Sequence, residues 1–93
     1  MKISVYEDNE RLCQLICMLI EATPEMELLH AYDNCVNALQ NTKEKKPDII
    51  VMDIEMPQKL GTEAVFEIKS KYPEIKIIMH TVFDENQHLF DSL

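Results

Sequence analysis

The 93-residue chain contains a single glycine, no tryptophan, and only nine basic residues against seventeen acidic ones. One glycine excludes the glycine-rich loops that bind dinucleotides or cradle the phosphate of a flavin. The net charge of −8 repels phosphate backbones, so this segment is not expected to bind nucleic acid by itself. Its acidity suits basic partners or divalent cations instead.

Long hydrophobic runs are also absent from the sequence. No apolar stretch approaches the roughly 20 residues that a membrane helix needs. The first five residues form an apolar alternation without a signal-peptide layout, so the protein is expected to be cytoplasmic and not membrane-bound. With 46% hydrophobic residues, the chain is expected to form one domain over residues 1–93.

The three cysteines, Cys13, Cys17 and Cys35, are an odd number and show no CxxC spacing. Cys13 and Cys17 lie on one face of an expected helix, and the three histidines are scattered along the chain. We therefore interpret the cysteines as small, half-buried hydrophobic side chains in a reducing compartment rather than as zinc ligands.

Two hydrophobic periodicities alternate along the chain. Lys2–Tyr6, Asp48–Met52 and Ile75–Met79 are short β-branched runs typical of strands buried in a parallel sheet, and Met26–Ala31 is a weaker candidate. Helical spacing separates them in four groups. Leu12, Leu15, Ile16, Leu19 and Ile20 have the spacing of a buried stripe, ended by Thr23-Pro24. The others are Cys35, Ala38 and Leu39, ended by the polar stretch Thr42–Lys46 and Pro47; Ala64, Val65, Ile68 and Tyr72, ended by Pro73; and Leu89, Phe90 and Leu93, beginning near Asp84.

This β-α-β-α-β-α-β-α order predicts an α/β fold. Short connections favour an open, doubly wound parallel sheet with right-handed crossovers and helices on both faces. The sequence ends inside the fourth expected helix, without a cap, so the domain is expected to be incomplete at its C-terminal end.

Acidic side chains follow two of the predicted strands. Glu7 and Asp8 come after the first, Asp53 after the third, and His80-Thr81 after the fourth, and function collects at such carboxyl ends. Neighbouring carboxylates disfavour each other's ionisation unless a cation joins them, and Mg²⁺ suits a site that handles phosphate. Glu7 and Asp8 could instead cap the first helix. Asp53 is harder to explain without a function, because burying an unpaired carboxylate is costly.

Three segments resemble the receiver domains of two-component response regulators: Val5-Tyr6-Glu7-Asp8-Asn9, Asp48–Pro57 followed by Gly61, and Met79-His80-Thr81. The resemblance covers the whole chain in order and spacing. The Thr81-Val82-Phe83 turn is most similar to receivers that precede LuxR-type helix-turn-helix domains. The resemblance implies a flavodoxin-like receiver fold with strand order 2-1-3-4, lacking the fifth strand and fifth helix.

The resemblance also implies a phosphoacceptor signalling function. Asp53 would accept a phosphoryl group from the phosphohistidine of a sensor histidine kinase, and the full-length protein would carry a DNA-binding output domain. Asp8, Asp53 and the backbone carbonyl of Glu55 would bind Mg²⁺ directly, with Glu7 acting through water. No enzymatic activity is expected beyond self-catalysed phosphorylation and dephosphorylation.

Further roles follow from the same resemblance. Thr81 would donate its hydroxyl to the phosphoryl group, and Pro57 and Gly61 would shape the loop beside the acceptor. His80 stands where receivers usually have an apolar residue, and we interpret it as a satisfied core histidine rather than a pH sensor. The lysine that normally pairs with the phosphoryl oxygens belongs to the missing strand, and Lys59, on a loop, is not expected to replace it.

Two other functions are compatible with the residues. The missing lysine favours an interaction module that keeps the fold without phosphorylation. A phosphatase-like hydrolase with Asp53 as nucleophile would need a second aspartate two residues later, where the chain has Glu55. Without a fifth strand, the fourth (Ile75–His80) would form an apolar sheet edge, so we expect a homo-oligomer through it.

Overall fold

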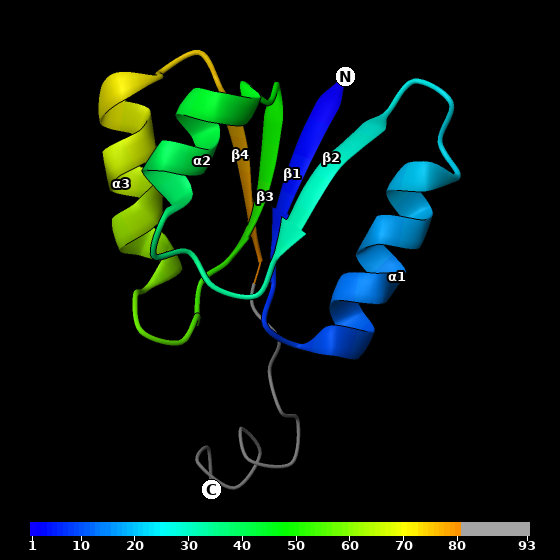
Figure 1. The fold of residues 1–93 in the computed structure, drawn as a ribbon, viewed down its shortest axis with the longest axis horizontal. Helices are drawn as coiled ribbons and strands as arrows, with labels where there is room; N and C mark the ends of the chain where they lie inside the picture. The colour runs from blue at the N-terminus through cyan, green and yellow to red at the C-terminus, as the bar shows by residue number, and fades with distance from the viewer. Residues whose placement is uncertain (81–93) are drawn as a thin grey trace, which may run out of the picture.

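The computed structural model describes residues 1–80, in which four parallel strands alternate with three helices (Figure 1). The strands are β1 (Lys2–Tyr6), β2 (Glu27–Tyr32), β3 (Ile49–Asp53) and β4 (Lys76–His80); the helices are α1 (Glu10–Glu21), α2 (Ala38–Lys45) and α3 (Gly61–Lys71). The sheet order is β2-β1-β3-β4, with every neighbouring pair parallel. The predicted fold class and strand order are confirmed. The fourth predicted helix lies outside the described residues.

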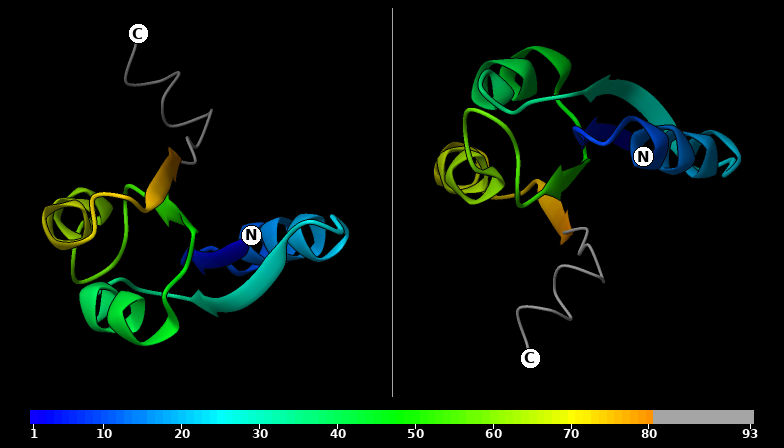
Figure 2. Two further views of the ribbon diagram at one scale, coloured as in Figure 1. Left: turned by 90° about the horizontal axis from the view of Figure 1, so that it is seen from above. Right: turned by 90° about the horizontal axis from the view of Figure 1, so that it is seen from below.

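Hydrophobic clusters cover both faces of the sheet, because successive side chains of a strand point to opposite sides. On one face, α2 and α3 lie over the buried side chains of Tyr6, Ile50 and Met52 (Figure 2). On the opposite face, α1 packs against Ile3 and Val5. The two central strands, β1 and β3, are therefore buried on both sides, which explains the continuously apolar run Ile49–Met52 in β3.

Helix α1 begins at an asparagine cap. The side chain of Asn9 accepts a hydrogen bond from the backbone N–H of Leu12 at 3.1 Å, which satisfies one of the free donors of the first turn. Asn9, and not Glu7 or Asp8, is therefore the N-cap of α1, so capping does not explain the two acids. The helix ends before Thr23-Pro24, as the sequence predicts.

The hydrophobic stripe predicted for α1 is only partly buried. The helix faces the sheet along Cys13, Ile16 and Ile20, and this line turns Leu15 and Leu19 outward, leaving them 57% and 69% exposed. The expectation that the whole stripe faces the core is therefore wrong at these two leucines, because α1 packs against the sheet through Cys13, Ile16 and Ile20 instead. The interpretation of Cys13 as a half-buried hydrophobic side chain is confirmed.

Helix α2 starts later than its sequence suggests and ends where the sequence predicts. It begins at Ala38, and Cys35 precedes it, although the Cys35 side chain is fully buried. The predicted end, in the polar stretch Thr42–Lys46 before Pro47, is confirmed. Thr42 itself lies inside the helix, where its buried hydroxyl donates a hydrogen bond to the Ala38 carbonyl at 2.8 Å. The helix continues to Lys45 and stops at Lys46, whose backbone is left-handed, with φ 52° and ψ 60°.

The outer strand β4 pairs only with β3 among the described residues. Ile78 is 55% exposed on it, so part of its apolar surface is open to solvent. Self-association through this strand stays a prediction. No helix in the described part of the chain combines the length and hydrophobicity needed to cross a membrane.

Replacing Lys46 with glycine is expected to stabilise the protein. A left-handed residue after a helix is unfavourable for every side chain with a Cβ, so Lys46→Gly should raise the free energy of unfolding by about 0.5–1 kcal/mol. The matched control Lys45→Gly removes the same charge from a helical position and should lower it by about 0.5–1 kcal/mol. Urea denaturation measures both changes. An equal decrease in the free energy of unfolding of the two variants would contradict the left-handed conformation of Lys46.

Candidate functional site

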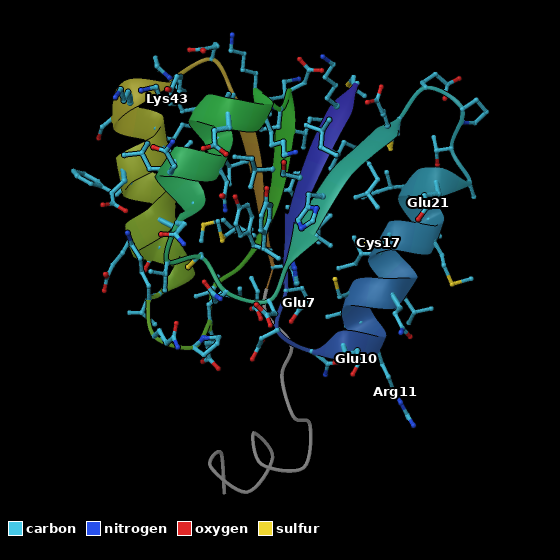
Figure 3. The ribbon with its side chains drawn as sticks, viewed as in Figure 1. Glu7, Glu10, Arg11, Cys17, Glu21 and Lys43 are labelled. Atoms are coloured by element: carbon cyan, nitrogen blue, oxygen red, sulfur yellow. The ribbon has the colours of Figure 1, made fainter. Side chains whose placement is uncertain are left out.

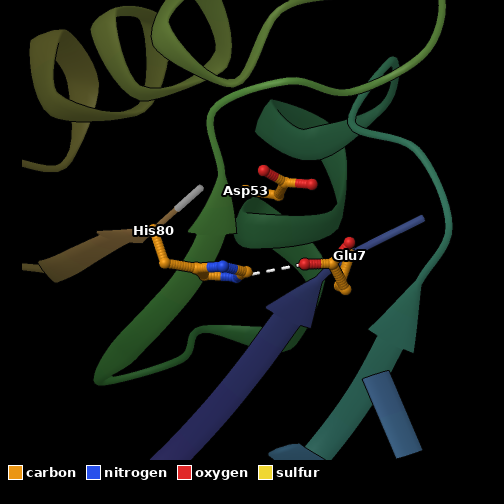
Figure 4. A group of neighbouring side chains, drawn as sticks. All are labelled: Glu7, Asp53 and His80. Atoms are coloured by element: carbon orange, nitrogen blue, oxygen red, sulfur yellow. Dashed lines mark ion pairs between the residues drawn. The ribbon is translucent and has the colours of Figure 1, made fainter. Parts of the chain in front are cut away.

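The carboxyl ends of the parallel strands bring three chemically competent side chains together. Glu7 follows β1 directly, Asp53 is the last residue of β3, and His80 is the last residue of β4. One ligating atom of each lies within 4.8 Å of the others (Figure 4). Figure 3 shows Glu7 at the end of the sheet where α1 begins, with Lys43 at the opposite end.

Strand register determines this convergence. Asp53 and His80 are paired in the β3–β4 ladder, and the His80 carbonyl accepts a hydrogen bond from the backbone N–H of Ile54 at 2.9 Å. Tyr6 and Met52 are paired in the neighbouring β1–β3 ladder, which places Glu7 beside Asp53. The three side chains therefore meet because their strands are adjacent and end at the same level.

The two carboxylates are deeply buried: Glu7 is 2% exposed and Asp53 is 4% exposed. Glu7 Oε2 accepts a hydrogen bond from the Asn9 N–H at 2.9 Å, while Glu7 Oε1 has no hydrogen-bond partner in the described residues. Asp53 Oδ1 accepts one from the Glu55 N–H at 3.2 Å. Two adjacent carboxylates with so few donors are electrostatically unfavourable, and a cation would relieve them.

The protonation of Glu7 reflects this environment. Burial, with smaller contributions from the Asp53 and Asp8 carboxyls, raises the pKa of Glu7 from 4.5 to about 7 against the opposing hydrogen bond from Asn9. Without a cation, Glu7 therefore exchanges its proton near neutral pH. A bound divalent cation would favour the ionised carboxylate, because it supplies the missing opposite charge.

His80 does not behave as a satisfied core histidine, and that expectation is wrong. Its Nε2 lies 3.4 Å from Glu7 Oε1, an ion-pair contact when the imidazole is protonated (dashed line in Figure 4). Neither atom has a hydrogen-bond partner in the described residues. His80 shares the side of β4 with exposed Ile78, whereas Ile77 points to the α2–α3 cluster. Alternation along the strand thus directs the imidazole to the carboxylates and away from the core.

Among the described residues, the predicted site residues Asp8 and Glu55 are not part of the group formed by Glu7, Asp53 and His80. Asp8 is exposed and outside the group, although it is near enough to affect the pKa of Glu7. Glu55 is exposed, and its backbone N–H holds Asp53. Thr81 lies outside the described residues. Of the four predicted metal ligands, the structure groups Glu7 and Asp53, and it adds His80, which the sequence argument placed in the core.

The loop after Asp53 passes very close to the end of β3. The backbone N–H of Gly61 donates a hydrogen bond to the Ile54 carbonyl at 2.9 Å, and a Cβ on Gly61 would lie 2.0 Å from the Asp53 carbonyl oxygen. Only glycine fits there without displacing the backbone of Asp53. Earlier in the loop, the exposed Pro57 accepts a hydrogen bond from the Lys59 N–H at 2.8 Å through its carbonyl.

Lys59 is held away from the carboxylates. Its amino group pairs with Glu67 on α3, and its carbonyl lies 3.0 Å from the Cys35 thiol. The expectation that Lys59 does not pair with the phosphoryl oxygens stays a prediction.

Comparison with known proteins identifies the family. Residues 3–93 match the family model of the response regulator receiver domain. The chain belongs to this family. Receiver domains of response regulators are signalling modules, and this one has the sheet order and the acidic strand ends described above.

Relatives of this receiver are longer proteins. It is 33% identical over 91 residues to the transcriptional regulatory protein CitT of Bacillus subtilis, covering 98% of the chain and 40% of CitT. It is also 33% identical over 94 residues to the oxygen regulatory protein NreC of Staphylococcus aureus, covering 100% of the chain and 43% of NreC. The chain therefore spans less than half the length of these relatives.

Solved structures show the same fold. The response regulator domain of Thermotoga maritima CheB superposes with a TM-score of 0.81 at 31% identity, over 87% of this receiver and 60% of that chain. A DNA-binding response regulator of the LuxR family from Staphylococcus aureus superposes with a TM-score of 0.80 at 31% identity, over 98% and 76% of the two chains.

Replacing Gly61 with alanine is expected to displace the backbone of Asp53. The added methyl group would overlap the Asp53 carbonyl oxygen, so Gly61→Ala should lower the free energy of unfolding by about 1–3 kcal/mol. The neighbouring exposed Thr62→Ala is the control and should change it by less than about 0.5 kcal/mol. Urea denaturation tests this, and parental stability in Gly61→Ala would show that the loop does not need a glycine.

The raised pKa of Glu7 predicts a pH dependence of stability in the presence of a chelator. Between the ordinary value of 4.5 and about 7, the folded state keeps a proton that the unfolded state has lost. The free energy of unfolding should therefore fall as the pH rises through this window. Glu7→Gln removes this cost and should exceed the parent in stability at pH 8 by on the order of 2 kcal/mol.

Denaturation curves between pH 5 and 8 provide the measurement. The control Glu27→Gln changes an exposed carboxylate of β2 and should follow the parent at every pH. A constant difference between Glu7→Gln and the parent across the window would rule out Glu7 as the titrating group.

Proposed function

We propose that this receiver accepts a phosphoryl group on Asp53 from the phosphohistidine of a sensor histidine kinase. The observation that supports this most is the burial of the Asp53 and Glu7 carboxylates side by side at the carboxyl end of the sheet. Burying two neighbouring carboxylates lowers the stability of the folded domain, so such a pair indicates a functional site. Phosphorylation would switch an output domain in a longer protein.

The attack on phosphorus falls to one carboxylate oxygen. The Glu55 N–H holds Asp53 Oδ1, which leaves Oδ2 to form the new bond to phosphorus. The phosphorus–nitrogen bond of the phosphohistidine breaks, and the imidazole leaves with the electron pair and takes up a proton. Gly61 keeps the loop close to Asp53, so the carboxylate is fixed in place before the kinase docks.

The residues present fit a divalent cation. Glu7 Oε1 is buried without a hydrogen-bond partner in the described part of the chain, and it lies beside Asp53. Glu7 and Asp53 would hold Mg²⁺, with Asp8 and the Glu55 carbonyl as the further ligands that the family resemblance implies. When bound, Mg²⁺ supplies positive charge that offsets the carboxylates and the phosphoryl oxygens.

The names of its relatives support a proposal for the output of a longer protein that contains this receiver. CitT is a transcriptional regulatory protein, and one of the matching structures is a DNA-binding response regulator of the LuxR family. We propose that this receiver likewise controls a DNA-binding domain and acts in the cytoplasm. The receiver segment itself carries a net charge of −8, so DNA contact would fall to the output domain.

Incubation with acetyl phosphate and Mg²⁺ tests the acceptor, with intact mass as the readout. We expect the parent to gain one phosphoryl group and Asp53→Asn to gain none, because the amide cannot form the acyl phosphate. Asp33→Asn is the matched control, since Asp33 is an exposed aspartate just after β2 at the same edge of the sheet, and it should be phosphorylated like the parent. No added mass in the parent would favour the alternative, an interaction module with the receiver fold.

A further inference from the structure

We propose that His80 is a third metal ligand beside Glu7 and Asp53, so that the pocket prefers a transition-metal ion such as Co²⁺, Ni²⁺ or Zn²⁺ over Mg²⁺. This inference rests on the proposed function, because it concerns the same cation site. It adds His80 as a ligand and gives the site a metal preference. Receivers usually have an apolar residue at this position.

The spacing of the ligand atoms fits one metal ion. Ligands to zinc lie about 2.0–2.2 Å from the metal, so two neighbouring ligand atoms around it are roughly 3.3 Å apart. His80 Nε2 and Glu7 Oε1 are 3.4 Å apart, and an Asp53 oxygen completes a triangle with all separations within 4.8 Å. An ion could therefore contact all three side chains after a small movement of Asp53.

Two buried atoms without hydrogen-bond partners are independent support for a cation at this position. Glu7 Oε1 and His80 Nε2 are both buried atoms without a hydrogen-bond partner among residues 1–80, and they face each other. Glu7 is 98% buried, since only 2% of it is exposed, so bulk water does not satisfy its carboxylate. Buried polar atoms are normally paired, and a cation between these two would satisfy both.

The donor set decides the metal. Mg²⁺ takes oxygen ligands almost exclusively, and an imidazole nitrogen adds little to its binding. Transition-metal ions bind imidazole well, with affinities that rise from Mn²⁺ towards Cu²⁺. Two carboxylates and one imidazole therefore form a mixed nitrogen and oxygen site, which selects against Mg²⁺ at equal concentrations.

Calorimetric titration of the parent, His80→Val and His30→Val with Co²⁺ and with Mg²⁺ tests the proposal. His80→Val should bind Co²⁺ at least about tenfold more weakly than the parent, while its Mg²⁺ affinity stays within about twofold. His30→Val removes an exposed imidazole from β2 and should bind both ions like the parent.

Two spectroscopic readouts identify the ligands. Zn²⁺ should shift the side-chain ¹⁵N resonance of His80 Nε2 and leave that of His30 unchanged. The Co²⁺ spectrum should lack a thiolate charge-transfer band, which separates this site from Cys13 and Cys17. Denaturation in chelator checks that His80→Val is folded, and His80→Gln serves as the second variant if it is not.

The outcomes separate this inference from the proposed function. Equal Co²⁺ affinity in the parent and His80→Val, or an unshifted His80 resonance, would overturn the role of His80 while phosphorylation of Asp53 with Mg²⁺ still stood. Co²⁺ binding that depends on His80, in a chain that acetyl phosphate does not modify, would support the metal site and refute the acceptor.

Discussion

The mutual repulsion of two buried carboxylates, Glu7 and Asp53, is the constraint around which this structure is organised. β1 and β3 are adjacent in the sheet and end at the same level, so the topology itself forces these side chains together. The cost is tolerated because the same strands are buried on both faces by apolar side chains. A sequence that concentrates an unfavourable contact in its most stable region normally does so for function.

The backbone around the two carboxylates is fixed by contacts that also define the secondary structure. Asn9 caps α1 with its side chain and holds Glu7 with its N–H, so the start of the helix and the orientation of the acid depend on one turn. Gly61 begins α3 and brings the loop against the Asp53 carbonyl. The site is therefore held by two helix starts, which gives the rigid support that a charge-dense pocket requires.

The sequence predicts most of the fold and the acidic pair because both follow from local patterns. Apolar β-branched runs mark β1 and β3, and an acid directly after each must lie at the sheet edge. The direction of His80 and the outward turn of Leu15 and Leu19 were not predictable in this way. They depend on where α1 lies over the sheet and on which face of β4 is covered, and these are tertiary relations that no spacing encodes. The start of α2 was misjudged because Cys35 is fully buried but precedes the helix.

The carboxylate pair also links stability to chemistry. A cation that binds the folded pocket and not the unfolded chain stabilises the fold in proportion to its occupancy. The same positive charge is what a carboxylate needs in order to attack a phosphoryl group. Under the proposed function, a metal-free receiver of this sequence would be less stable and less reactive for one reason, the unbalanced charge of Glu7 and Asp53. The imidazole of His80 belongs to the same charge balance, because among the described residues its ligand atom lies within 4.8 Å of both carboxylates.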